Sequence, residues 1–177
     1  MFQKLSIAAL VVFTTIATNL QTASAQTTDT QTFTVVVPTS ISITAPNNAV
    51  QLTHDLTDNP QQFPPQAWLV RGNVGTGVTV AFTAGTPFVH TTDASSKRDL
   101  KLDVAVGSFQ GPAYWSVEQE TASTNYLNNE DTATVTVSSN GAGRASLNLT
   151  VSFITDEFGS FINGDYVSTI TGTIASN

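Results

Sequence analysis

The stretch ASLNLTVSF, residues 145–153, decides the fold class of this chain. Apolar and polar side chains alternate along it, with Leu147 and Leu149 on one parity and Asn148 and Thr150 on the other. A period of two is that of a β-strand with one buried face and one solvated face. This stretch therefore predicts a strand that covers a hydrophobic core.

The same alternation recurs along the chain, in runs such as 32–37, 78–82, 100–106 and 133–137. Segments rich in Gly, Pro, Asn and Asp separate the runs, and these residues favour turns. We find no long segment with the 3.6-residue period of an amphipathic helix. The sequence predicts an all-β fold, a single Ig-like antiparallel β-sandwich of about eight or nine strands over residues 26–177.

The first residues have the layout of a signal peptide. Lys4 precedes an apolar stretch from Leu5 to Ile16, and the small-residue motif ASA follows at residues 23–25. We expect cleavage before Gln26, with an uncleaved membrane anchor as the alternative. The apolar stretch is shorter than the roughly 20 residues that a membrane span needs. The expected mature protein is secreted, to the cell surface or the extracellular space, and has no membrane span.

Charge and cysteine content exclude several functions. The chain has 13 acidic and 6 basic residues and a formal net charge of −7. Nucleic-acid binding needs clustered Lys and Arg, whereas the one basic cluster here, Lys97, Arg98 and Lys101, is interleaved with aspartates. The absence of cysteine removes disulfides, thiol catalysis and thiolate metal sites. Because the chain is acidic and its basic residues are interleaved with aspartates, we expect no nucleic-acid partner.

Patterns typical of enzymes are missing. GNVGTG, residues 72–77, has neither the spacing of a dinucleotide-binding loop nor the lysine of a P-loop. His54 and His90 lie in separate segments, the motif G-x-S-x-G is absent, and the serines of SSNGAGRAS, residues 138–146, have no positioned base. We expect no enzymatic activity and no cofactor; a secreted hydrolase is the weakest alternative.

Two smaller features remain open from the sequence. Asp156, Glu157 and Asp165 are candidate calcium ligands, but they lack the alternating spacing of a calcium loop, so solubilising loop charge is the simpler interpretation. The motif NLT at Asn148 fits a glycosylation site. For His54 we prefer a loop histidine to a metal ligand, because zinc sites need three or four ligands.

The two ends of the chain alternate as well. In GDYVSTITGTIASN, residues 164–177, Tyr166, Ile170 and Ile174 share one parity. A tyrosine at the start of such a strand can bury its ring and hydrogen-bond its hydroxyl to a nearby loop. QTFTVVVPTSISITAP, residues 31–46, contains two alternating runs, and the proline between them indicates a bend at a sheet edge.

Together these ends resemble fimbrial major subunits of the colonisation-factor (alternative chaperone–usher) type and their spore-coat-U and secreted-pilin relatives. In that family the N-terminal strand of one subunit completes a sheet of the next. The resemblance implies that residues 26–37 are an exchangeable strand whose Phe33, Val35 and Val37 fill pockets of a neighbour. It likewise implies an acceptor sheet lined by Tyr166, Ile170 and Ile174.

We therefore expect a non-enzymatic structural subunit of a bacterial cell-surface fibre or coat. Its partners are then copies of itself or other surface subunits. The alternative is a monomeric secreted module that binds carbohydrate or protein through its loops. The aromatic candidates for such binding are Phe63, Trp68, Phe158 and Phe161.

Overall fold

The computed structural model describes residues 27–177 except residue 48. The expected signal peptide, residues 1–25, lies outside the described residues, so its cleavage stays a prediction. The chain divides into a part that ends at Val36 and a compact unit, Val37–Asn177. We call residues 27–36 the N-terminal segment and Val37–Asn177 the sheet unit, and describe each by itself.

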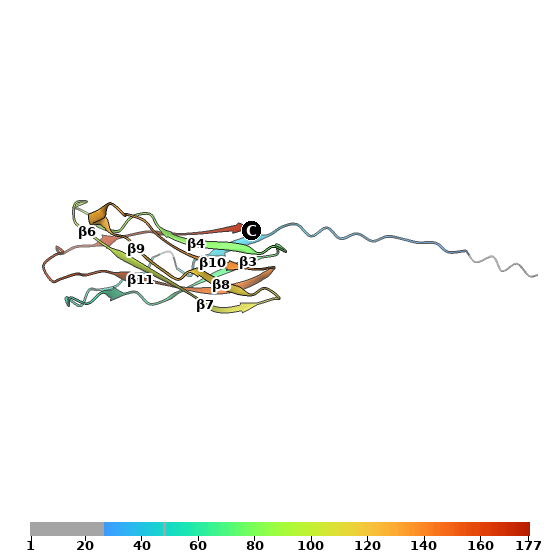
Figure 1. Cartoon of the computed structure of the whole chain (residues 1–177), viewed down its shortest axis with the longest axis horizontal. Coiled ribbons are helices and arrows are strands. Elements are labelled where there is room, and N and C mark those ends of the chain that lie inside the picture. Colours follow the sequence, from blue (N-terminus) through green and yellow to red (C-terminus); the bar gives the residue numbers. More distant parts are fainter. Residues whose placement is uncertain (1–26, 48) are drawn as a thin grey trace, which may run out of the picture. The chain divides into compact units, whose positions relative to one another are not determined.

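The sheet unit is almost entirely antiparallel β-structure, as the alternation predicts (Figure 1). The largest sheet has six strands, in the order β1-β3-β11-β7-β9 with β2 paired to β11. These strands are β1 (Ile41–Thr44), β2 (Gln61–Gln62), β3 (Gln66–Gly72), β7 (Leu100–Gln110), β9 (Thr121–Ser123) and β11 (Gly143–Phe153).

Two further sheets complete the unit. A four-stranded sheet has the order β13-β4-β10-β8, and a three-stranded sheet has the order β12-β5-β6. The first contains β4 (Val78–Ala84), β8 (Trp115–Gln119), β10 (Ala133–Ser139) and β13 (Ile170–Ser176), and the second contains β5 (Phe88–His90), β6 (Lys97–Arg98) and β12 (Tyr166–Val167). A single 3₁₀ turn spans Tyr126–Asn128.

The six-stranded and four-stranded sheets contribute to one hydrophobic core. Leu147 of β11 and Phe82 of β4 are 0% exposed, and Leu149 is 2% exposed. On the other face of β11, Asn148 and Thr150 are half-buried and make no part of this core. The predicted assignment of the two faces is therefore confirmed for residues 145–150, and the glycosylation motif at Asn148 lies mid-strand. Ser152, which has the parity of Asn148 and Thr150, is buried nonetheless, at 6% exposed.

The described residues form thirteen strand segments, more than the eight or nine expected. The additional ones are short: β2, β6 and β12 have two residues each. Two residues cannot display a period, so alternation does not reveal such strands. The described part of the chain also holds no helix with the length and apolar character needed to cross a membrane.

The connections lie at two opposite ends of the sheet unit (Figure 1). One end, which we call the hairpin end, holds the tight turns 73–77, 111–114 and 140–142. The other, which we call the loop end, holds the three-stranded sheet and the longer connections 45–60, 85–99, 124–132 and 154–165. β1 starts at the hairpin end, because Ile41 pairs with Gly72.

Candidate functional site

The residues predicted to be exchanged form no strand. Residues 27–40 have neither strand nor helix, although 32–37 alternate as a strand should. Phe33, Val35 and Val37 are 83%, 86% and 74% exposed. Burying a side chain of this kind stabilises by about 1.5–3 kcal/mol. An extended apolar segment with this exposure therefore gains free energy from any complementary apolar surface that also offers backbone partners.

β13 is a strand with one free edge. It pairs with β4 along its whole length, from Ile170 opposite Ala84 to Ser176 opposite Val78. No other strand of the described residues pairs with it. Its outer edge therefore presents backbone N–H and C=O groups that a further strand can use.

Apolar side chains line this free edge. Ile170 and Ile174 of β13, Ile43 of β1 and Trp68 of β3 are half-buried and pack against the core. A Cβ atom at Gly172 would lie 2.7 Å from Trp68 Cζ3 and 2.9 Å from Ile43 Cδ1. A glycine at this position lets the two sheets approach where both have an edge. We call Ile43, Trp68, Ile170, Gly172 and Ile174 the β13 seam.

Tyr166 lies apart from the seam, because the predicted terminal strand is divided. Tyr166 belongs to β12 and pairs with His90 of β5 in the three-stranded sheet. Its hydroxyl accepts the N–H of Ile162 at 3.1 Å and hydrogen-bonds with Ser96 Oγ at 2.7 Å. The hydroxyl of Tyr166 thus joins two connections of the loop end, one at Ser96 and one at Ile162. Of the predicted acceptor residues, the structure places Ile170 and Ile174 on the free edge.

The candidate metal ligands do not gather into a site. In residues 27–177, residue 48 aside, no group of three His, Asp or Glu side chains is close enough to hold a metal ion. Asp156, Glu157 and Asp165 are exposed residues of the loop end.

His54 has a structural environment. Its Nδ1 accepts the N–H of Leu56 at 2.9 Å, so the ring proton lies on Nε2. Nε2 lies 3.0 Å from Thr155 Oγ1, and that hydroxyl donates to the carbonyl of Asn59 at 2.8 Å. Both ring nitrogens are therefore used in joining the 54–59 loop to Thr155.

Three carboxylates have lowered pKa values, two of them in turns and one on a strand. Hydrogen bonds from Thr57 lower the pKa of Asp55, and hydrogen bonds from Ser95 lower the pKa of Asp93. The hydroxyl of Ser138 lowers the pKa of Glu118 on β8. A carboxyl group that serves as a general acid near neutral pH needs the opposite shift. These three groups are held as anions instead.

The aromatic candidates for loop binding divide between core and surface. Phe63 and Trp68 pack against the core, and Phe161 is half-buried with its ring 4.7 Å from that of His54. Phe158 is the exposed one of the four, at 63%. Of these four aromatic side chains, Phe158 is therefore the one that is exposed enough to contact a ligand.

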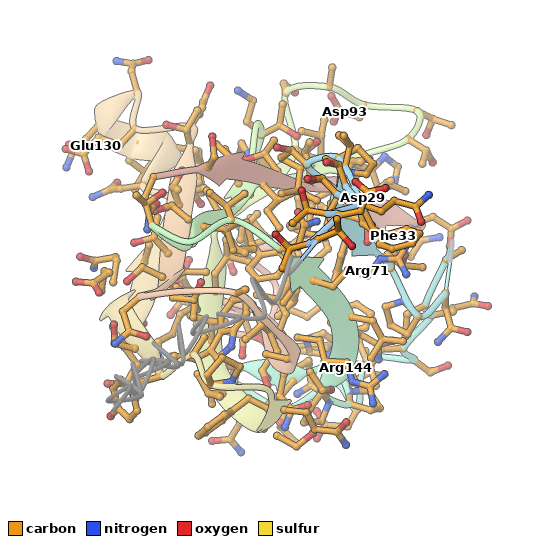
Figure 2. The ribbon with its side chains drawn as sticks, turned by 90° about the vertical axis from the view of Figure 1, so that its right-hand side faces the viewer. Asp29, Phe33, Arg71, Asp93, Glu130 and Arg144 are labelled. Carbon is orange, nitrogen blue, oxygen red and sulfur yellow. The ribbon has the colours of Figure 1, made fainter. Side chains whose placement is uncertain are left out.

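Sequence reasoning missed a pair of arginines at the hairpin end, which Figure 2 labels. Arg71 of β3 and Arg144 of β11 lie directly opposite each other across the two strands. Arg71 Nε donates to Ser42 Oγ and Arg144 Nε donates to Gln110 Oε1, each at 2.9 Å. The two arginines are distant in sequence, so only the pairing register of β3 with β11 could have revealed them.

Comparison with protein-family models finds no family that matches this chain, and comparison with curated proteins finds no similar sequence.

Proposed function

We propose that this protein is a non-enzymatic structural subunit of a bacterial cell-surface fibre or coat, secreted through its N-terminal signal. Residues 32–37 of one copy add as a strand to the free edge of β13 in another copy. In this proposal the sheet unit is an Ig-like sandwich that lacks one strand at the β13 seam. The free edge of β13 beside half-buried apolar side chains is the observation that carries the proposal.

The donated segment matches the acceptor in length and pattern. β13 offers seven residues, and Thr32 to Val37 covers most of that length. Backbone hydrogen bonds to β13 supply affinity, and every second side chain enters the sandwich. Phe33, Val35 and Val37 share the parity that faces the seam, so addition removes three exposed apolar side chains from water.

A chain that completes its own sheet is the closest competing arrangement. Residues 32–37 lead into β1 at the hairpin end, so a segment folded back along its own β13 would run parallel to it. Such a chain would be a self-sufficient monomer with no need of a partner strand. It would also cover the seam permanently.

A second candidate function is a monomeric module that binds a ligand through its loops. Three exposed apolar side chains at the loop end favour it: Leu56 at 63%, Phe158 at 63% and Ile162 at 48%. Apolar side chains that gather in an exposed patch are a common mark of a binding surface. This candidate requires no strand exchange.

Deletion of residues 26–37 from the mature chain tests the proposal. We expect polymers to disappear, and the shortened chain to bind a synthetic peptide of residues 26–37. Intact protein that remains monomeric at every concentration would contradict the proposal and favour the loop-binding module.

A matched pair of substitutions separates strand addition from nonspecific hydrophobic association. Val35→Asp places a charge in the apolar seam, where an unpaired charge costs several kcal/mol, so we expect polymers to be lost. Thr34→Asp places the same charge on the opposite face, toward solvent, and should leave most polymer intact. Equal effects of both substitutions would argue against a strand with the predicted parity.

A further inference from the structure

Charge is distributed unevenly between the two ends of the sheet unit. The loop end carries most of the chain's 13 acidic side chains: Asp55, Asp58, Asp93, Asp99, Glu130, Asp131, Asp156, Glu157 and Asp165. The turns of the hairpin end, 73–77, 111–114 and 140–142, contain no Asp or Glu side chain, and Arg71 and Arg144 flank them. Acidic side chains therefore gather at the loop end of the sheet unit, whereas two arginines lie at its hairpin end.

Neither arginine of the pair forms an ion pair within the described part of the chain. Among the described residues, the ion pairs are Lys97 with Asp131 and Lys101 with Asp103, and neither includes Arg71 or Arg144. Like charges directly opposite each other across two strands are destabilising. Guanidinium groups also have the geometry to bind carboxylates with two hydrogen bonds. The pair is thus suited to an external carboxylate.

The pair borders an open hollow. It has a volume of about 480 Å³ and is lined by Ser40, Arg71, Gly72, Asn73, Gln110, Gly111, Gly143 and Arg144. Three of these residues are glycines, of which Gly72 is buried, Gly143 half-buried and Gly111 exposed.

Some carboxylates at the loop end have no hydrogen-bond or ion-pair partner among the described residues. Within the described residues, the side chains of Asp156, Glu157 and Asp165 take part in none of the hydrogen bonds or ion pairs. All three residues are exposed. They differ from Asp55 and Asp93, whose carboxylates are held by their own loops.

The direction of strand addition decides which ends meet. β13 runs toward the hairpin end, where Ser176 pairs with Val78. A strand added antiparallel to it ends with Val37 at the loop end of the acceptor. The chain then reaches Ser40 of the donor within about 10 Å at full extension, and Asn73 holds Ser40 at the donor's hairpin end. Antiparallel addition therefore brings a hairpin end against a loop end.

We infer that the Arg71–Arg144 pair of each copy is a receptor for the free carboxylates at the loop end of the next copy, Asp156, Glu157 and Asp165. The pairing selects antiparallel strand addition, since parallel addition would bring two hairpin ends and both arginine pairs together. The inference rests on the proposed function and adds to it an interface between the sheet units. In this inference the two arginines, which are not part of the β13 seam, determine the orientation in which one subunit joins the next in the fibre.

Exposed hydrophobic side chains at both ends fit the same contact. Phe109 and Tyr114 at the hairpin end are 47% and 64% exposed, with their ring centroids 6.4 Å apart. Phe158 and Ile162 at the loop end are 63% and 48% exposed. Stacking of one end on the other supplies each apolar set with a partner, inside a rim of opposite charges.

The test uses the full mature chain and follows polymerisation by light scattering. We expect Arg71→Glu with Arg144→Glu to slow polymerisation roughly tenfold at low salt, because charge complementarity acts mainly on association. The difference from wild type should vanish at about 1 M salt, where charges are screened within about 3 Å. Adding Asp156→Arg and Glu157→Arg to the double variant restores opposite charges and should restore polymerisation. The control is Lys101→Glu, which makes the same change of charge as Arg144→Glu alone but lies outside the arginine pair. It should have little effect on the rate of polymerisation.

The outcomes separate this inference from strand addition itself. A double arginine variant that polymerises at the wild-type rate overturns the inference, while Val35→Asp still tests the donated strand independently. Failure of the charge swap to rescue a slowed double variant also overturns it. A double variant that polymerises normally but loses binding to a polyuronate resin assigns the pair to an acidic polysaccharide instead.

Discussion

β11 and β13 carry the same alternation of apolar and polar side chains, yet their surroundings differ. β11 pairs with β3 on one side and β7 on the other, and its Leu147 and Leu149 are fully buried. β13 pairs with β4 alone, and its Ile170 and Ile174 are only half-buried. Alternation thus reports which face of a strand meets the core. It does not report whether both edges of the strand have partners.

The largest expected effect of a substitution lies in β11. Leu149→Ala should lower the free energy of unfolding by about 2–5 kcal/mol, from lost burial and the cavity left behind. Thr150→Ala, on the outer face of the same strand, should cost much less. Urea unfolding of both variants measures the difference, and comparable losses would mean that the two faces are assigned the wrong way round.

A smaller effect is expected where β13 meets Trp68. Gly172→Ala puts a Cβ atom 2.7 Å from the Trp68 ring, so β13 or the ring must shift. Overpacking of this kind costs about 1–3 kcal/mol. Gly85→Ala is the control, since nothing lies within 4 Å of a Cβ there. Equal unfolding midpoints for the two variants would show that β13 does not approach Trp68 this closely.

Ile174→Ala sharpens the comparison of the two strands. In dissociated chains it should cost about 1 kcal/mol, since a half-buried side chain has less area to lose than Leu149. In the proposed polymer an added strand would cover Ile174, so there the loss should be larger. Thermal unfolding of dilute and polymerised samples provides the measurement. The same loss in both samples would argue that nothing covers the seam.

The smallest effect concerns acid. The folded-state pKa values of Asp55, Asp93 and Glu118 are lowered by hydroxyl hydrogen bonds. Their contribution to stability is therefore present above the unfolded-state pKa and is lost as the pH falls through the folded-state pKa. We expect stability to decline modestly below about pH 4, and Ser138→Ala to flatten the Glu118 part of that decline. An unchanged acid profile in Ser138→Ala would contradict this assignment.

The sequence was sufficient for the features that depend on one strand alone. The all-β class and the buried faces of residues 100–104 and 145–149 follow from period-two alternation. Features that need two strands were not accessible: the opposition of Arg71 and Arg144 depends on register, and the seam depends on Gly172 meeting Trp68. The division between Tyr166 and Ile170 was hidden because both keep the same parity.

The central claim is that residues 32–37 become a strand only by adding to another copy. Amide hydrogen exchange of the segment, measured in polymer and in chains diluted until they dissociate, tests it most directly. A backbone amide is protected when it is hydrogen-bonded in a stable sheet. We predict protection of residues 33–37 in the polymer and rapid exchange of the same amides in dissociated chains. Equal exchange in the two samples, whether both rapid or both protected, would contradict the account.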